Sequence, residues 1–252
     1  MTPVETLPKA PITEAITEVK FVSKDGASKE EDFLSFYNAI RERFPHRKQQ
    51  LKIVHQVSFQ LGEEKSVIEK REMAGFRFES DDRKDIVQVR HDRLSVHRLT
   101  PYTNWAAYSA TAKELWAAFA QIFPLSGVQR IGLRYLNRIE LPLPVDDIRK
   151  FCLLFPETPP EVPQLWSNFL MRFSHKDRET NAQGTVTLTL DPDSAKSPAL
   201  LPLILDIHAF YRYEAPVSPN SEELWQDAAK LRDVKNRIFF SCLTPSTIQL
   251  FK

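Results

Sequence analysis

The chain contains little glycine and cysteine. Six glycines are spread over 252 residues, and neither GxGxxG nor GxxxxGKS/T can be read from them, which argues against the common Gly-rich phosphate-binding loops. The two cysteines, Cys152 and Cys242, form no CxxC pair and lie among apolar residues. We expect them to be reduced, buried thiols in a cytosolic protein.

An excess of one charge is also missing. The chain has 34 Lys and Arg against 33 Asp and Glu, so any basic patch for a nucleic acid must be local. The first residues contain no apolar signal core, and the apolar runs are shorter than a membrane span, so we expect a soluble, cytoplasmic protein with no membrane partner. Histidine and acidic spacings match no zinc or calcium motif, and no cofactor or metal ion is predicted.

The most informative segment is the strand predicted from Val128 to Pro142. Side chains alternate along a strand, so an apolar and a polar set fall on opposite faces. The apolar set is Ile131, Leu133, Tyr135, Ile139 and Leu141, and the polar set is Arg130, Arg134, Arg138 and Glu140. The arginines of one strand face need carboxylates, water or an anionic ligand.

Carboxylates for these arginines could come from the first predicted strand, residues 12–22. Glu14 and Glu18 lie four residues apart and share a face, with the same spacing as the arginines. If the two strands are neighbours at the centre of the sheet, a cross-strand ladder of ion pairs is the favoured interpretation. An arginine left unpaired would instead make an anion site.

Two further groups are candidates. Asp206, His208 and Arg212 share one face of the strand predicted over 201–213, and an Asp–His pair could orient an imidazole as a base. No partner nucleophile is recognisable, so a structural histidine is favoured. Tyr102 and Trp105 follow a predicted hairpin and line either a pocket, an interface or the sheet edge.

The order of elements predicts an α+β fold with two similar halves, residues 1–125 and 126–252, in one continuous structural unit. Each half reads as a strand, a helix, a meander of antiparallel strands and a second helix, which gives a curved antiparallel sheet with helices on one face. The first half has strands at 12–22, 51–61 and 75–80, a helix opened by Ser28 and Glu31, a hairpin at 85–98 and a helix capped by Ser109. The second half has strands at 128–141, 166–175, 184–190 and 201–213, a helix at 146–155, and a last helix from Asn220.

Within the hairpin, we predict that Asp85 pairs with Arg98 and Val87 with Val96. The element order resembles the TATA-binding-protein-like and helix-grip folds, a likeness of shape that implies no function.

Three motifs carry a second resemblance: PITEAITEVKF (11–21), VQVRHDRLSVHRLTPYTNW (87–105) and RIGLRYLNRIELP (130–142). With them, the chain resembles a sporadically distributed bacterial family of uncharacterised proteins of about the same length. The resemblance implies a bacterial cytoplasmic setting and no catalytic residue. Families with such a distribution often belong to mobile or defence-related gene sets.

Two classes of function stay open. The first is a non-enzymatic binding or regulatory module that presents the curved sheet to a macromolecular partner. A protein partner is expected, since near-zero net charge disfavours a nucleic acid. The second is a small-ligand or anion binder, or an enzyme, that uses the face with Arg134, Arg138 and His208. The oligomeric state is not indicated.

Overall fold

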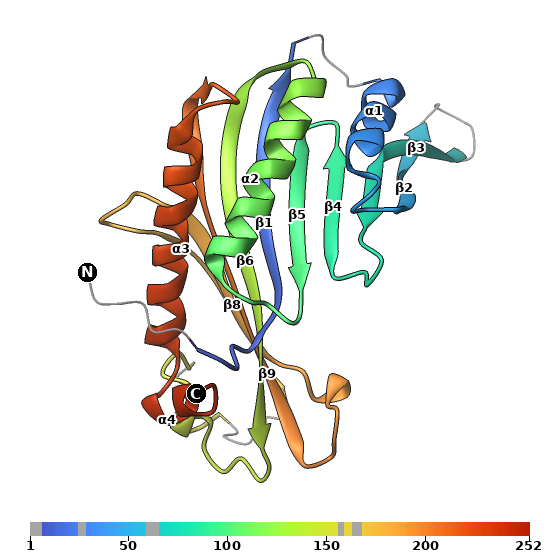
Figure 1. Cartoon of the computed structure of the whole chain (residues 1–252). Helices are drawn as coiled ribbons and strands as arrows, with labels where there is room; N and C mark the ends of the chain where they lie inside the picture. Colours follow the sequence, from blue (N-terminus) through green and yellow to red (C-terminus); the bar gives the residue numbers. More distant parts are fainter. Residues whose placement is uncertain (1–6, 25–28, 59–65, 156–158, 163–167) are drawn as a thin grey trace.

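The computed structural model describes residues 7–24, 29–58, 66–155, 159–162 and 168–252, with the backbone alone at 53–58 and 66–71. Nine strands form one antiparallel sheet in the order β2-β3-β4-β5-β1-β6-β9-β8-β7. The described part is therefore an α+β fold, as predicted (Figure 1). The strands are β1 (Ile12–Ser23), β2 (His46–Ser58), β3 (Ser66–Glu79), β4 (Asp85–Arg90), β5 (Arg93–Leu99), β6 (Leu125–Pro142), β7 (Leu170–Lys176), β8 (Gln183–Leu190) and β9 (Leu200–Val217).

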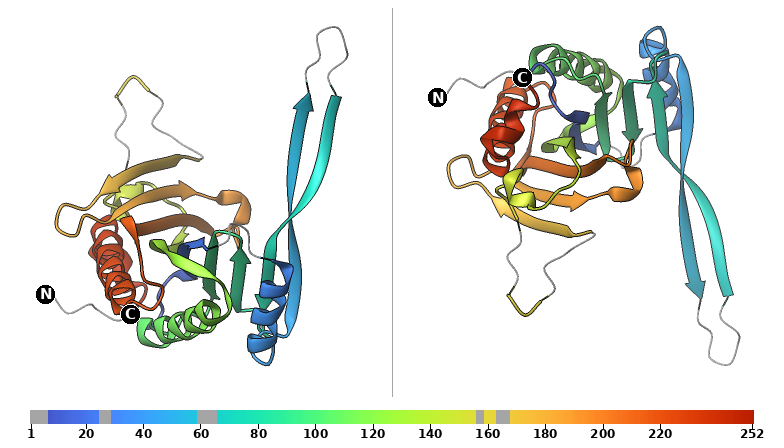
Figure 2. Two further views of the ribbon diagram at one scale, coloured as in Figure 1. Left: turned by 90° about the horizontal axis from the view of Figure 1, so that it is seen from above. Right: turned by 90° about the horizontal axis from the view of Figure 1, so that it is seen from below.

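Three longer helices cover one face of the sheet, as Figure 1 shows: α1 (Glu30–Ile40), α2 (Trp105–Ile122) and α3 (Glu222–Cys242). A short helix, α4 (Pro245–Gln249), follows α3. The views of Figure 2 show the curvature of the sheet and the β2–β3 hairpin extending away from the rest of the fold. The helices leave the opposite face of the central strands uncovered, and that face is the candidate site below.

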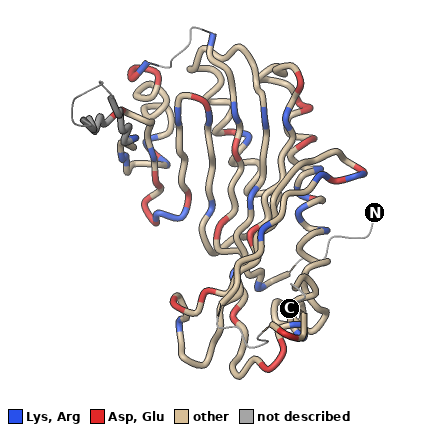
Figure 3. The backbone as a smooth tube through the Cα atoms, turned by 180° about the vertical axis from the view of Figure 1, so that it is seen from behind, with Lys and Arg blue, Asp and Glu red and all other residues tan. Residues whose placement is uncertain are grey.

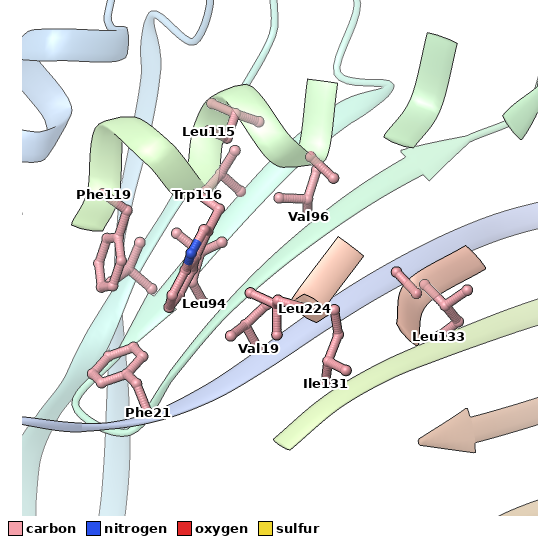
Figure 4. Packing of buried hydrophobic residues seen from close by; sticks show 14 of the residues in the cluster. Val19, Phe21, Leu94, Val96, Leu115, Trp116, Phe119, Ile131, Leu133 and Leu224 are labelled. Atoms are coloured by element: carbon pink, nitrogen blue, oxygen red, sulfur yellow. The ribbon is translucent and has the colours of Figure 1, made fainter. Parts of the chain in front are cut away.

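The core lies between the helices and the sheet. Apolar side chains from all three longer helices meet those of the central strands in one cluster, which Figure 4 shows around Trp116, Phe119 and Leu224. On the strands, Val19, Ile131 and Leu133 are at most 1% exposed. Burial of each such side chain stabilises the fold by roughly 1.5–3 kcal/mol. The alternation seen in the sequence of β6 therefore orients one face of that strand into the core.

Cross-strand pairing follows two of the predictions. Asp85 faces Arg98 and Val87 faces Val96 in the β4–β5 hairpin, and Arg98 Nη1 lies 2.8 Å from Asp85 Oδ2. β1 pairs with β6 at the centre of the sheet, so the two predicted halves share one continuous sheet.

Several predicted boundaries are wrong. Helix α2 begins at Trp105 rather than near Ser109, because Asn104 caps it by accepting a hydrogen bond from the Ala107 N–H at 2.9 Å. The helix predicted over 146–155 is only a 3₁₀ turn at Ile148–Lys150, and Ser221 rather than Asn220 caps α3. Ser28, Leu61 and Trp166, which bounded predicted elements, lie outside the described residues.

Both cysteines are free and buried, as predicted. The Cys152 thiol donates to the backbone oxygen of Cys242 at 3.1 Å, and residues 152 and 243 form an isolated antiparallel bridge. Burial raises the pKa of Cys152 to about 11 and that of Cys242 to about 12, so both thiols are held in the neutral form.

Candidate functional site: the helix-free face of the sheet

The helix-free face of the central strands is polar. Figure 3 views the molecule from behind and shows Lys, Arg, Asp and Glu on several neighbouring strands. Because β1, β6 and β9 each bury one set of alternating side chains against the helices, their other set points to this face. Six predicted site residues belong to that set: Arg130, Arg134, Arg138, Asp206, His208 and Arg212.

The predicted ladder between β1 and β6 is reduced to one ion pair. Arg130 Nη1 lies 3.1 Å from Glu18 Oε1, but Glu14 bonds His97 of β5 instead, with 2.8 Å between its Oε1 and the imidazole Nδ1. The strand register explains the difference. Glu18 faces Gly132 and Glu14 faces Leu136, so neither carboxylate stands directly opposite an arginine.

The other two arginines of β6 find partners elsewhere. Arg134 forms a two-pronged ion pair with Asp206 of β9, with Nη2 2.6 Å from Oδ2 and Nε 2.9 Å from Oδ1. Arg138 Nε lies 2.7 Å from Glu140 Oε1, and its Nη1 donates to the Ser194 hydroxyl. The prediction that the arginines pair with carboxylates is therefore right in kind, and the expected partners are wrong for two of them.

Asp206 and His208 do not act on each other in the predicted way. Asp206 is engaged by Arg134, and His208 Nε2 lies 2.8 Å from Arg130 Nη2. That nitrogen accepts from the guanidinium, so the imidazole is neutral. Burial, and then the charge of Arg130, lowers the pKa of His208 to about 4. Because its lone pair is occupied, this histidine is a poor general base as it stands in the structure.

Gly132 provides the space for the His208–Arg130 contact. A Cβ at residue 132 would lie 3.2 Å from His208 Nε2 and 3.3 Å from the Cβ of Phe210. The Arg130 guanidinium carbon also lies 4.0 Å from the centroid of the Phe210 ring. Arg130 is thereby held between a carboxylate, an imidazole and a ring, and burial lowers its pKa from the usual value.

A shallow hollow of about 220 Å³ opens on this face beside Gly132. Its charged and titratable lining comes from five strands: Glu18, Arg90, Arg93, His97, Arg134 and His208. Glu18 takes ion pairs from Arg93 and Arg130, at 3.2 and 3.1 Å. The centre of the hollow thus has its positive charges partly balanced by protein carboxylates.

At one end of the hollow, which Arg90 and Arg93 line, basic residues form a continuous line across five neighbouring strands. We call it the basic row: Arg90 (β4), Arg93 (β5), Lys20 (β1), Arg130 (β6) and Arg212 (β9). Each is the register partner of the next. With strands about 4.8 Å apart, the row is about 19 Å long. Within the described residues, Arg90, Lys20 and Arg212 have no ion pair, whereas Arg93 and Arg130 do.

Sequence reasoning found only part of the basic row. Arg130 and Arg212 were candidates, whereas Lys20, Arg90 and Arg93 were not. The signal was present, because the predicted hairpin register places Arg90 opposite Arg93 and the β1–β6 pairing was anticipated. What the sequence lacks is the offset between hairpin and β1, which decides that Arg93 lies opposite Lys20.

Tyr102 and Trp105 lie apart from the other candidates. They stand on the helix side of the sheet, where the Tyr102 hydroxyl lies 3.2 Å from that of Tyr135 and the Trp105 ring contacts Tyr108. Both line a separate cavity. The predicted site residues therefore divide between two sites on opposite faces of the sheet.

Comparison with known proteins gave no match to a family model or to a curated protein. No helix in the described part of the chain is long and apolar enough to cross a membrane. Among the described residues, no group of three or more His, Cys, Asp or Glu side chains could hold a metal ion.

Proposed function

We propose that the protein is a non-enzymatic binding module whose helix-free sheet face binds single-stranded nucleic acid through the phosphate backbone. The observation that carries the proposal is the basic row, which lines up five cationic side chains across five adjacent strands. Like charges in direct register disfavour a sheet, so a row of this kind has a cost for folding. An anionic partner that covers the row offsets that cost.

The charges of the basic row suit an extended polyanion better than a small anion. Arg90, Lys20 and Arg212, which lack ion pairs within the described residues, are spread along the row rather than gathered at one point. Three arginines line the hollow, and two of them, Arg93 and Arg134, are already paired with Glu18 and Asp206. A small anion in the hollow would therefore meet only one arginine without an ion pair among the described residues, Arg90.

The near-zero net charge of the whole chain disfavours a general nucleic-acid binder, but it leaves room for a local basic patch, and the basic row is such a patch. Phosphate charges repeat regularly along a strand, as the side chains of the row repeat at the spacing of the sheet. Open sheet faces bind single strands in several nucleic-acid-binding folds. An acidic protein segment is the other polyanion that the row could meet.

Two further proposals concern the internal repeat of the fold and the biological setting of the protein. We propose that the halves are a structural pseudo-repeat. The element order and the central position of β1 and β6, with β5 and β9 flanking them, support this. A setting in a mobile or defence-related bacterial system is the second, and it rests on the family resemblance alone.

The test is fluorescence anisotropy with a labelled 20-nucleotide single strand of mixed sequence, over a range of salt concentrations. The triple variant Lys20→Ala, Arg90→Ala, Arg212→Ala removes the three unpaired cations of the row. We expect binding at least about tenfold weaker at low salt, and a slope of log K against log salt that is shallower by about 2.

A matched control replaces three exposed cations outside the row, in Arg41→Ala, Lys113→Ala, Arg178→Ala. It lowers the net charge equally and is expected to bind as the parent protein does. If control and row variant bind alike, the attraction is nonspecific and the proposal is wrong. Tight binding of poly-glutamate with no binding of the oligonucleotide would replace the nucleic acid by an acidic protein.

A further inference from the structure

A second site lies on the helix side of the sheet, independent of the basic row. It is a cavity of about 480 Å³ between residues 7–12, the start of α2, β6 and the C-terminal half of α3. This volume lies within the range of small-molecule sites, roughly 300–1,000 Å³. Its walls are largely apolar, with Leu7, Ile12, Trp105, Phe239 and Phe240 among them.

Lys235 is the unusual member of the lining. The residue is only 9% exposed, and its Nζ lies 4.1 Å from the centroid of the Tyr135 ring. Within the described residues its ammonium group has neither a hydrogen bond nor an ion pair. A buried charge without a partner is strongly unfavourable, and burial, aided by Arg232, lowers the pKa of Lys235 to about 7.

The groups that line the cavity beside Lys235 are polar, and none of the described ones carries a negative charge. Tyr102 and Tyr135 share a hydrogen bond between their hydroxyls at 3.2 Å, and the Asn137 amide donates to the Leu205 backbone oxygen at 2.9 Å. Arg232, one turn before Lys235 on α3, adds a second cation to the lining, and its Nη1 lies 3.4 Å from Asp233 Oδ1. No Asp or Glu lines the cavity among the described residues.

We propose that this cavity binds a small organic carboxylate with an apolar body, whose carboxylate pairs with Lys235 and Arg232 while its body contacts Trp105 and Phe239. The ligand supplies the negative charge that the lining lacks, and the apolar walls supply burial for the rest of it. A neutral apolar molecule of the same size would leave Lys235 unpaired. The proposal does not depend on nucleic-acid binding at the opposite face.

The test uses hexanoate, octanoate and 4-phenylbutyrate as carboxylates of known structure, with 1-octanol as the uncharged counterpart of octanoate. Binding is measured by isothermal titration calorimetry and by the shift of the thermal unfolding midpoint. We expect at least one carboxylate to bind, and octanoate to bind at least tenfold more tightly than octanol. Lys235→Met, which keeps the length and apolar stem, should lose this preference, whereas Lys113→Met on the surface of α2 should retain it.

Binding should also weaken as the pH rises above about 7, where Lys235 loses its proton. The charged and titratable groups that face it are Arg232 and Asp233 of α3, Tyr135 of β6, and Tyr102. Burial raises the pKa of both tyrosines, so neither changes charge in this range. The proposal is overturned if none of the three carboxylates binds, if octanol binds as tightly as octanoate, or if Lys235→Met binds octanoate as the parent does.

Discussion

Lys235→Met should make the protein more stable, and the gain should depend on pH. In the unfolded chain this lysine has an ordinary pKa of about 10.4, whereas burial lowers it to about 7 in the folded protein. The unfolded chain therefore binds the proton more tightly between these two values. The free energy of unfolding therefore rises with pH between these two values, as the folded protein releases the proton first. Below pH 7 the lysine is charged in both states, and its destabilising effect on the fold is largest.

The magnitude follows from the difference in pKa. Each unit corresponds to about 1.4 kcal/mol, so the lysine destabilises the folded protein by about 5 kcal/mol at pH 6 and by about 2 kcal/mol at pH 9. Methionine carries no charge and has nearly the same volume, so it should pack in the same space at small cost. The variant should therefore exceed the parent by several kcal/mol at pH 6, and by about 3 kcal/mol less at pH 9.

The assay is urea unfolding of both proteins at pH 6 and pH 9, with the midpoint and slope fitted at each pH. Comparison of the two proteins cancels groups such as the buried cysteines, which titrate in both. The reasoning is refuted if Lys235→Met is no more stable than the parent at pH 6, or if the difference between the proteins is the same at both pH values. Either result would mean that the ammonium group is solvated or paired in solution.

Three further predictions concern the core, the polar face and the thiols. Leu133→Ala should lower the free energy of unfolding by about 2–5 kcal/mol, because Leu133 is 0% exposed. The control Leu170→Ala, at a residue that is 72% exposed, should change it by less than about 0.5 kcal/mol. Equal effects of the two substitutions in urea unfolding would contradict the burial pattern. Arg134→Ala should lower the free energy of unfolding by up to about 1 kcal/mol, because the Arg134 side chain is 47% exposed and water partly screens its ion pair with Asp206. A decrease of several kcal/mol in urea unfolding would show instead that Asp206 needs this partner to remain in the fold. Cys152 and Cys242 should react with a thiol reagent only after denaturation, and rapid labelling of the native protein would place a thiol at the surface.

The sequence predicts the sheet well where alternation is strict. The pattern of β6 and the chemically matched pairs of the β4–β5 hairpin lead to the correct faces and register, because burial of one face penalises a one-residue slip. Local signals were weaker at helix ends. Ser109 and Asn104 are both good capping residues, and only the packed position of the preceding chain decides that Asn104 caps α2.

The site was predictable only in part, for a related reason. An ion pair depends on the offset between strands far apart in sequence, so Arg134 could not be assigned to Asp206 rather than to a carboxylate of β1. The burial of Lys235 was predictable from the helical spacing of α3, although the sequence analysis does not name it as a candidate. Ala228, Leu231, Phe239 and Cys242 continue the buried stripe of α3 at spacings of three and four residues, and residue 235 falls on it.

The salt dependence of binding in a single variant tests whether the basic row contacts phosphates. Arg212 is exposed, lies at one end of the row and has no ion pair within the described residues, so its removal should leave the fold unchanged. Arg212→Ala should make the slope of log K against log salt shallower by about 0.7 for a single-stranded oligonucleotide. Glu214→Gln, on the same strand and the same face, should strengthen binding. An unchanged slope in Arg212→Ala, with unchanged affinity, would mean that Arg212 does not contact phosphates and that the basic row is not the binding surface.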